Sequence, residues 1–267
     1  MTLTVENGCF SYDGRHTVLS DINFSASSGE ILAVLGKNGS GKTTLLRCGV
    51  GLLKWSSGRS LLDGKDVSHM RNRELWSKIS YVPQAKSSFG SYTVLESVLL
   101  GFGSSISIFG KPQKSDAEKA FAVLKRLNIE NLAYKKCSEL SGGEKQMALI
   151  ARSLACDPKI LILDEPESNL DFKNQITVLD VLSKLRDSGI CCIFNTHFPD
   201  HALRTADRAL LLGDDGKCIC GKTGDIVTEE NIQRTFGVKV KILSVTSGNK
   251  TVKTVVPVST VQSDGNF

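Results

Sequence analysis

Short apolar runs recur along the chain and indicate buried strands. They are ILAVL at 31–35, ISYV at 79–82, ILIL at 160–163, CCIF at 191–194 and ALLL at 209–212. Each run is almost continuously apolar rather than alternating, as expected of a strand covered on both faces of its sheet. Helical patterns separate several of the runs, for example residues 172–189, which end on a glycine. Strands that alternate with helices predict an α/β core.

Three other stretches have a different pattern. Residues 3–12 and 17–27 predict an antiparallel β layer before the core begins. Between Gln84 and Pro158 the pattern is helical with no good strand candidate, which predicts a helical insertion at about 88–157. Near the end of the chain, the runs VKVKILSV at 238–245 and TVKTVVPV at 251–258 predict a β-hairpin. The expected division is therefore a main domain, residues 1–225, that carries the insertion, and a β-rich tail, residues 226–267.

Composition narrows the classes of protein that the chain could belong to. With 40% hydrophobic and 23% charged residues it has a soluble globular composition. No apolar run approaches the roughly 18 residues of a membrane span, and no secretory signal is visible. The net charge of +5 is spread without a long basic run, so nucleic-acid binding is not expected. The eight cysteines form no Cys-x-x-Cys pair, which favours buried thiols over disulfides or metal ligands.

The segment GKNGSGKT, residues 36–43, matches the phosphate-loop pattern G-x-x-x-x-G-K-[ST]. It follows a predicted strand and opens a predicted helix, which is the context that the pattern requires. Glycines allow successive N–H groups to converge on a β-phosphate, Lys42 would neutralise β- and γ-phosphate oxygens, and the Thr43 hydroxyl would ligate Mg²⁺. The predicted nucleotide-binding residues of this segment are Gly36, Asn38, Gly39, Ser40, Gly41, Lys42, Thr43 and Thr44.

Two acidic residues end the predicted strand ILILD. Asp164 and Glu165 come at its carboxyl end, where ligands collect in open α/β sheets. We expect Asp164 to hold Mg²⁺ and Glu165 to polarise a water molecule. The alternative is an ordinary loop start with two solvated acids.

Residues 140–144, LSGGE, form a second candidate anion site, called here the signature segment. A serine and two glycines precede a predicted helix, and the N–H groups at a helix start attract anions. A chain with a phosphate loop does not need a second clamp for the same phosphate. The spacing of the residues leaves the purpose of this clamp open.

Six motifs together resemble the ATP-binding subunits of ABC transporters. They occur in that family's order between about Val5 and Asp225, and they are GKNGSGKT, YVPQ, LSGGE, ILILDEP, SNLD and NTH. The resemblance implies a P-loop NTPase core of the ABC ATPase type, with an antiparallel β subdomain and a helical insertion, that hydrolyses ATP with Mg²⁺. It also implies a head-to-tail homodimer in which the signature segment serves the partner's ATP.

The resemblance gives roles to individual residues. Ser141 and Gly143 would contact the γ-phosphate of the partner's nucleotide, Gly142 would belong to the same binding segment, and Asp171 would cross the same interface. The local alternative for Asp171 is a helix N-cap.

Three further positions match the family's site residues. Tyr12 would stack on adenine, with an edge-strand aromatic as the alternative. Gln84 would contact Mg²⁺ and the attacking water, and His197 would bond the γ-phosphate. Two departures leave the hydrolysis rate open: Glu144 stands where the family usually has glutamine, and Glu167 where it often has threonine.

The helical segment and the tail are similar to those of ATPases that energise import of iron–siderophores, haem and cobalamin. This implies two separate permease subunits, a substrate-binding protein, and a peripheral place on the cytoplasmic side of the membrane. Residues 85–101 would dock the permease through Phe89, Gly90 and Tyr92, or else form a flexible surface loop. Other classes are a soluble ABC ATPase of iron–sulfur cluster assembly, one of DNA repair or translation, and an exporter ATPase.

Overall fold

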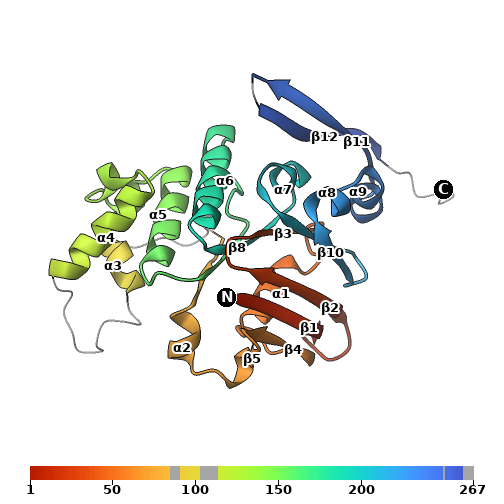
Figure 1. The fold of residues 1–267 in the computed structure, drawn as a ribbon, viewed down its shortest axis with the longest axis horizontal. Helices are drawn as coiled ribbons and strands as arrows, with labels where there is room; N and C mark the ends of the chain where they lie inside the picture. The colour runs from red at the N-terminus through yellow and green to blue at the C-terminus, as the bar shows by residue number, and fades with distance from the viewer. Residues whose placement is uncertain (85–90, 103–113, 249, 261–267) are drawn as a thin grey trace.

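A computed structural model describes residues 1–84, 91–102, 114–248 and 250–260 of the chain. In these ranges, six strands form a central sheet in the order β10-β9-β3-β8-β7-β6 (Figure 1). All neighbours are parallel except β10, which runs antiparallel to β9. The bounds are Ile31–Leu35 for β3, Ile79–Val82 for β6, Ile160–Asp164 for β7, Cys191–Thr196 for β8, Arg208–Leu212 for β9 and Cys218–Lys222 for β10. The five predicted core strands are confirmed.

The central strands are apolar throughout because both faces of the sheet are covered. In β3, Ile31, Ala33 and Leu35 belong to one buried cluster, which includes residues of the helices α6 (Phe172–Asp187) and α7 (Pro199–Thr205). Leu32 and Val34 belong to a second cluster, shared with the helix α1 (Lys42–Gly49) and the antiparallel layer. The absence of alternation in the sequence therefore reports burial from two sides.

The antiparallel layer predicted at the start of the chain is confirmed. Its strand order is β2-β1-β4-β5, and β1 pairs with both β2 and β4. The bounds are Thr2–Ser11 for β1, Thr17–Ser27 for β2, Ser57–Leu62 for β4 and Lys65–Asp66 for β5. The layer covers the sheet face on which α1 also lies, and so it stands beside the phosphate loop.

Helices fill the connection between β6 and β7, where the described residues contain no strand, as predicted. Figure 1 shows α3, α4 and α5 side by side, and these three helices contact one another. The helices of the chain are α1 Lys42–Gly49, α2 Asn72–Trp76, α3 Val94–Gly101, α4 Lys114–Arg126, α5 Gly142–Leu154, α6 Phe172–Asp187, α7 Pro199–Thr205, α8 Thr223–Ile226 and α9 Glu229–Phe236. None of these described helices is long and apolar enough to span a bilayer.

The tail contains the predicted hairpin, which packs on α7 and α9 at the edge of the molecule (Figure 1). Its strands are β11 Val238–Ser247 and β12 Lys250–Thr260. Asp200 of α7 holds β12, because its Oδ1 accepts hydrogen bonds from Thr254 Oγ1 at 2.8 Å and the Val255 N–H at 2.7 Å.

All eight cysteines are free thiols. Cys191 and Cys192 lie on opposite faces of the sheet, one in each buried cluster. Burial raises the pKa of Cys192 to about 12, so this thiol stays protonated and behaves as a small apolar side chain. The prediction of burial is confirmed for four cysteines, whereas Cys9, Cys156, Cys218 and Cys220 are partly exposed.

Candidate nucleotide-binding site

The phosphate loop joins the end of β3 to the start of α1. Gly39 and Gly41 have φ of 84° and 99°, a left-handed conformation that glycine adopts without strain. Gly41 is the N-cap of α1, and no side chain caps this helix start. The first N–H groups of α1 are therefore open to an anion, as expected for a loop that holds phosphate.

Lys42 points back into the loop. Its Nζ donates hydrogen bonds to the carbonyls of Gly36 and Lys37, both at 2.8 Å. Burial lowers the pKa of Lys42, while the negative charges of Glu165, Asp164 and Glu167 act in the opposite direction. The Lys42 ammonium group is thus held beside the two loop carbonyls. It also interacts electrostatically with the three acidic residues.

Ser40 provides an unused donor in the same loop. Its Oγ is buried and has no hydrogen-bond partner among the described residues. A buried hydroxyl without a partner is costly, and a phosphate oxygen would satisfy it. This orphaned group fits a bound nucleotide.

Asp164 is the most strongly held side chain of the site. It is 4% exposed and accepts hydrogen bonds from Thr43 Oγ1 at 2.8 Å, Tyr81 Oη at 2.9 Å and Asn195 Nδ2 at 2.7 Å. Burial, together with the charge of Asp164, raises the pKa of Tyr81, which therefore remains a protonated donor. These contacts bring the predicted Thr43 and Asp164 together.

Glu165 adopts a left-handed backbone conformation with φ of 46°. Such a conformation costs a non-glycine residue about 1–3 kcal/mol and is often found at functional sites. Its N–H donates to Asn195 Oδ1, and its Oε2 accepts from Gln84 Nε2 at 2.9 Å and Ser168 Oγ at 2.8 Å. The structure thus also joins the predicted pair of Gln84 and Glu165.

His197 follows β8, directly after the strand that carries Asn195. Its Nδ1 is buried and has no partner among the described residues. The His197 ring stacks on that of Phe198 with centroids 4.0 Å apart. In the described part of the chain, His197 makes no hydrogen bond to the phosphate loop.

Glu167, the second departure from the family pattern, is 1% exposed and bonds His201 of α7, with Oε1 and Nδ1 3.2 Å apart.

The signature segment forms the start of α5. Ser141 is the N-cap and forms a capping box with Glu144. Hydrogen bonds from the Ser141 N–H at 2.8 Å and from Lys135 Nζ at 3.0 Å lower the pKa of the Glu144 carboxyl. The negative charge at this unusual position is therefore balanced by Lys135.

The start of α5 packs directly against the start of α6. A Cβ on Gly143 would lie 2.3 Å from Asn174 Cγ, so a larger residue does not fit without a shift. Asp171 caps α6, because its Oδ1 accepts from the Asn174 N–H at 2.8 Å. The predicted capping role of Asp171 is confirmed, and the two segments expected to serve a partner's nucleotide lie side by side.

Tyr12 is 65% exposed, and its Oη lies 3.0 Å from Thr44 Oγ1 at the start of α1. The ring packs edge-to-face on Phe10. Its exposed face stands next to the phosphate loop, where an adenine could stack on it.

The two clamps are separate within one chain. No hydrogen bond or ion pair joins Ser141 or Asp171 to the phosphate loop in the described ranges. The residues expected to act in cis are thus gathered around Lys42 and Asp164, whereas those expected to act in trans lie on the helical segment and α6.

Sequence reasoning did not identify Tyr81, Asn195 and Ser168. Tyr81 belongs to the motif YVPQ and Asn195 to the motif NTH, but the sequence indicated no function for either residue. Asn195 is the last but one residue of β8, and Asp164 ends β7, so a polar side chain near the carboxyl end of a strand was the available signal. Asp164 and Asn195 are direct neighbours in the β7–β8 register.

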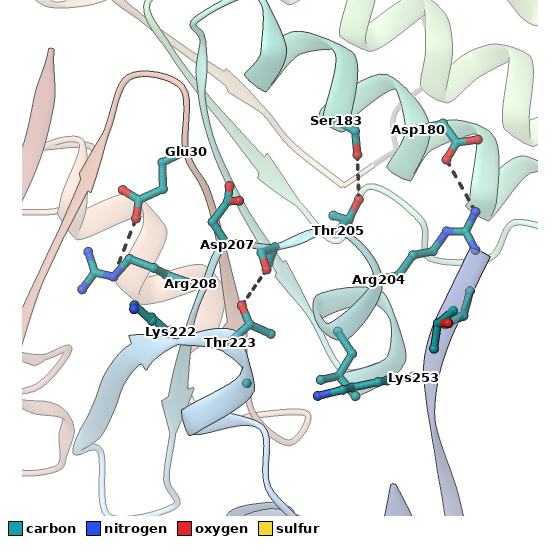
Figure 2. A pocket seen from close by; sticks show the side chains of 15 residues that line it. Glu30, Asp180, Ser183, Arg204, Thr205, Asp207, Arg208, Lys222, Thr223 and Lys253 are labelled. Atoms are coloured by element: carbon teal, nitrogen blue, oxygen red, sulfur yellow. Dashed lines mark hydrogen bonds and ion pairs between the residues drawn. The ribbon is translucent and has the colours of Figure 1, made fainter. Parts of the chain in front are cut away.

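A separate cavity of about 860 Å³ lies between α6, α7, β10 and β12 (Figure 2). Among its charged side chains, Arg204 pairs with Asp180 at 3.6 Å and Arg208 with Glu30 at 3.7 Å. None of the predicted nucleotide-binding residues lines it. The cavity is therefore distinct from the nucleotide site.

Comparisons with known proteins agree with this geometry. The family described as "ABC transporter" matches residues 19–168, more than half of the chain. The molybdate import ATP-binding protein MolC of Haemophilus influenzae is 37% identical, over 88% of this chain and 87% of that protein. A protein of Helicobacter pylori named "Probable iron chelatin transport ATP-binding protein" is 33% identical, over 88% and 93%.

The fold is similar to that of a chain solved in an inward-facing "metal-chelate type ABC transporter". The TM-score is 0.85 at 34% identity, covering 96% of this chain and 97% of that one. The phosphate loop, the buried Asp164 beside it and these similarities lead to one conclusion. The chain belongs to the ABC transporter family as an ATP-binding subunit, and it is an ATPase.

Proposed function

We propose that this ATPase energises import of a metal chelate, namely an iron chelate, haem or cobalamin, through a separate permease. The observation that carries the substrate class is the similarity to the chain of a metal-chelate type transporter over nearly the whole length of both chains. Because the similarity covers 96% of this chain, it includes the helical segment and much of the C-terminal hairpin. The relative named for molybdate import makes an oxyanion the main competing substrate.

The chemistry of hydrolysis follows from the acidic residues. Glu165 acts as the general base for the attacking water, because it stands at the end of β7 beside Asp164, and Gln84 and Ser168 orient its carboxylate. Lys42 and the N–H groups of the phosphate loop stabilise the negative charge that develops on the transferred phosphoryl group. His197 contacts the γ-phosphate.

The oxygen donors of the site fit Mg²⁺. Thr43, Asp164 and Gln84 offer hydroxyl, carboxylate and amide oxygens, which are hard ligands suited to this ion. Bound there, Mg²⁺ would neutralise phosphate charge. The hydrogen bond between Thr43 and Asp164 holds their two oxygens 2.8 Å apart.

The functional unit is a head-to-tail homodimer of this chain with two permease subunits and a binding protein. Separation of the two clamps within one chain supports it, since Ser141 and Gly143 then serve the partner's nucleotide. We assign residues 1–225 to the ATP-binding domain, with the helical insertion at about 88–157, and 226–267 to the tail. The complex would hold this subunit peripherally on the cytoplasmic side of the membrane.

We place the permease contact in the segment that follows Gln84, residues 85–101. Tyr92 and Leu100 are 51% and 50% exposed at either end of α3, and such exposed apolar side chains suit a protein interface. Phe89 and Gly90, the other predicted contact residues, lie outside the described residues.

The experiment that tests the proposal combines purification and uptake. The tagged chain should co-purify with an integral-membrane protein, and Tyr92→Asp should abolish this association while ATP hydrolysis by the isolated subunit stays measurable. Tyr134→Asp is the matched control, because Tyr134 is also exposed, at 78%. Co-purification with soluble scaffold proteins instead would favour a role in iron–sulfur cluster assembly.

Uptake identifies the substrate. A strain that lacks this chain should lose uptake of a labelled iron chelate, haem or cobalamin and retain uptake of labelled molybdate. Normal uptake of all three metal chelates would contradict the proposal, and loss of molybdate uptake alone would make the chain an oxyanion importer subunit.

A further inference from the structure

Glu167 and His201 form a buried pair that the hydrolysis chemistry above does not use. Glu167 is 1% exposed and His201 is 9% exposed, and Glu167 Oε1 lies 3.2 Å from His201 Nδ1. The other carboxyl oxygen, Oε2, is buried with no hydrogen-bond partner among the described residues. A carboxyl buried in this way is costly unless it is paired, so its position depends on His201.

On one side, the pair is attached to the turn that carries the general base. Glu167 lies two residues after Glu165, in a turn closed by the Ser168 N–H to the Glu165 carbonyl at 3.1 Å. Ser168 Oγ also donates to the Glu165 carboxylate at 2.8 Å. A displacement of Glu167 would therefore move the backbone that orients Glu165.

On the other side, the pair is attached to the turn that carries His197. The Phe198 ring contacts both histidines, with centroid distances of 4.0 Å to His197 and 4.8 Å to His201. The His201 N–H donates to the Phe198 carbonyl at 3.1 Å. The rings of His201, Phe198 and His197 thus lie in consecutive contact, with interplanar angles of 51° and 40°.

The other polar side-chain contacts of α7 in the described residues lie away from this point. Arg204 pairs with Asp180 of α6 at 3.6 Å, with side chains 32% and 58% exposed, beside the cavity of Figure 2. Exposed pairs of this kind stabilise little. Asp200 faces the hairpin instead. In the described part of the chain, the Glu167–His201 bond is the polar side-chain contact between α7 and the turn after β7.

We propose that Glu167 and His201 are positioning residues for ATP hydrolysis, which hold the general base Glu165 and the γ-phosphate contact His197 in one fixed arrangement. In the described part of the chain, neither residue makes a hydrogen bond or ion pair with the phosphate loop. The inference rests on the proposed roles of Glu165 and His197. It explains how a carboxylate replaces the threonine common at position 167: the chain supplies a histidine on α7 to receive it.

The test uses Glu167→Thr, His201→Ala and the double variant of the full chain. Displacement of catalytic groups by a fraction of an ångström to 1 Å can cost up to about 10²-fold in rate, so each single variant should lower kcat by roughly tenfold or more. KM for ATP should change little in all three variants. The midpoint of thermal unfolding should fall in His201→Ala, which leaves the Glu167 carboxyl buried without its partner, and should change least in Glu167→Thr. The double variant should be no slower than the slower single variant, because both remove the same contact.

Two further variants distinguish positioning from general damage. His201→Asn places an amide nitrogen near the position of Nδ1, and it should recover much of kcat. Arg204→Ala, on the same helix, should hydrolyse ATP like the unmodified chain. If kcat, KM and thermal stability all deteriorate together and His201→Asn recovers none of them, the pair is only structural and the inference is wrong.

His197→Ala separates this inference from its premise. If His197→Ala abolishes hydrolysis while Glu167→Thr and His201→Ala hydrolyse ATP normally, the positioning pair is refuted and the role of His197 stands. If His197→Ala hydrolyses ATP normally, the role of His197 fails, and the inference fails with it.

Discussion

At the scale of single residues, the site is organised around two adjacent carboxylates with different surroundings. Asp164 is enclosed by three donors, Thr43, Tyr81 and Asn195. Glu165 is half-buried, and among the described residues its carboxylate accepts hydrogen bonds at one oxygen, from Gln84 and Ser168. The Glu165 carboxylate therefore retains acceptor capacity for a water molecule. Both oxygens of Asp164, by contrast, already accept hydrogen bonds from side chains of the site.

This difference predicts the effect of neutralising Glu165. Glu165→Gln keeps the shape of the side chain and removes the base, so ATP binding should persist while turnover falls by roughly 10²–10⁴-fold. The measurements are nucleotide affinity and steady-state phosphate release. Glu74→Gln on α2, where the partly exposed Glu74 side chain pairs with Lys65 and Lys78, is the matched control and should hydrolyse ATP normally. Near-normal hydrolysis by Glu165→Gln would assign the base to another group.

At the scale of elements, the sequence predicted the strands because a sheet buried on both faces leaves a continuous apolar run. It predicted Asp164, Glu165 and the phosphate loop because motif chemistry is local. It could not predict the partnership of Asp164 with Asn195, since that depends on β7 and β8 being neighbours in register. The contact of Glu167 with His201 likewise arises only when α7 packs over the turn after β7.

The junction between α5 and α6 gives a prediction at the same scale. Gly143→Ala would put a Cβ 2.3 Å from Asn174 Cγ, so the two helix starts must separate or Asn174 must move, at a cost of about 1–3 kcal/mol. Gly142→Ala would meet only Leu170 Cδ2 at 3.5 Å, an ordinary contact, and alanine favours the helix. The midpoint of thermal unfolding should therefore be lower in Gly143→Ala than in the unmodified chain. It should not be lowered in Gly142→Ala. Equal midpoints would show that the junction is loosely packed.

At the scale of the whole molecule, the question is why one chain has two phosphate clamps. The phosphate loop has an uncapped helix start and an unpaired buried hydroxyl at Ser40. The signature segment, by contrast, has no polar contact with that loop in the described ranges. Two copies arranged head to tail would bring each clamp onto the other copy's nucleotide, and ATP would then stabilise the dimer by binding to both chains.

This arrangement predicts different defects for the two clamps. Lys42→Ala should weaken ATP binding to the isolated chain, because it removes a phosphate contact in cis. Ser141→Ala should leave that binding almost unchanged and impair dimer formation on addition of ATP. Dimer formation is best measured by analytical ultracentrifugation in the Glu165→Gln background, where slow turnover lets the ATP-bound dimer accumulate.

Mixing the two single variants, with Glu165 intact, gives the decisive result. In a mixed dimer, the phosphate loop of the Ser141→Ala chain meets the intact signature segment of the Lys42→Ala chain, so one complete site is restored while the other site carries both defects. The mixture should therefore hydrolyse ATP faster than either variant alone at the same total concentration. If mixing gives only the average of the two separate rates, or if both variants lose affinity for ATP equally as isolated chains, the nucleotide site does not span two chains.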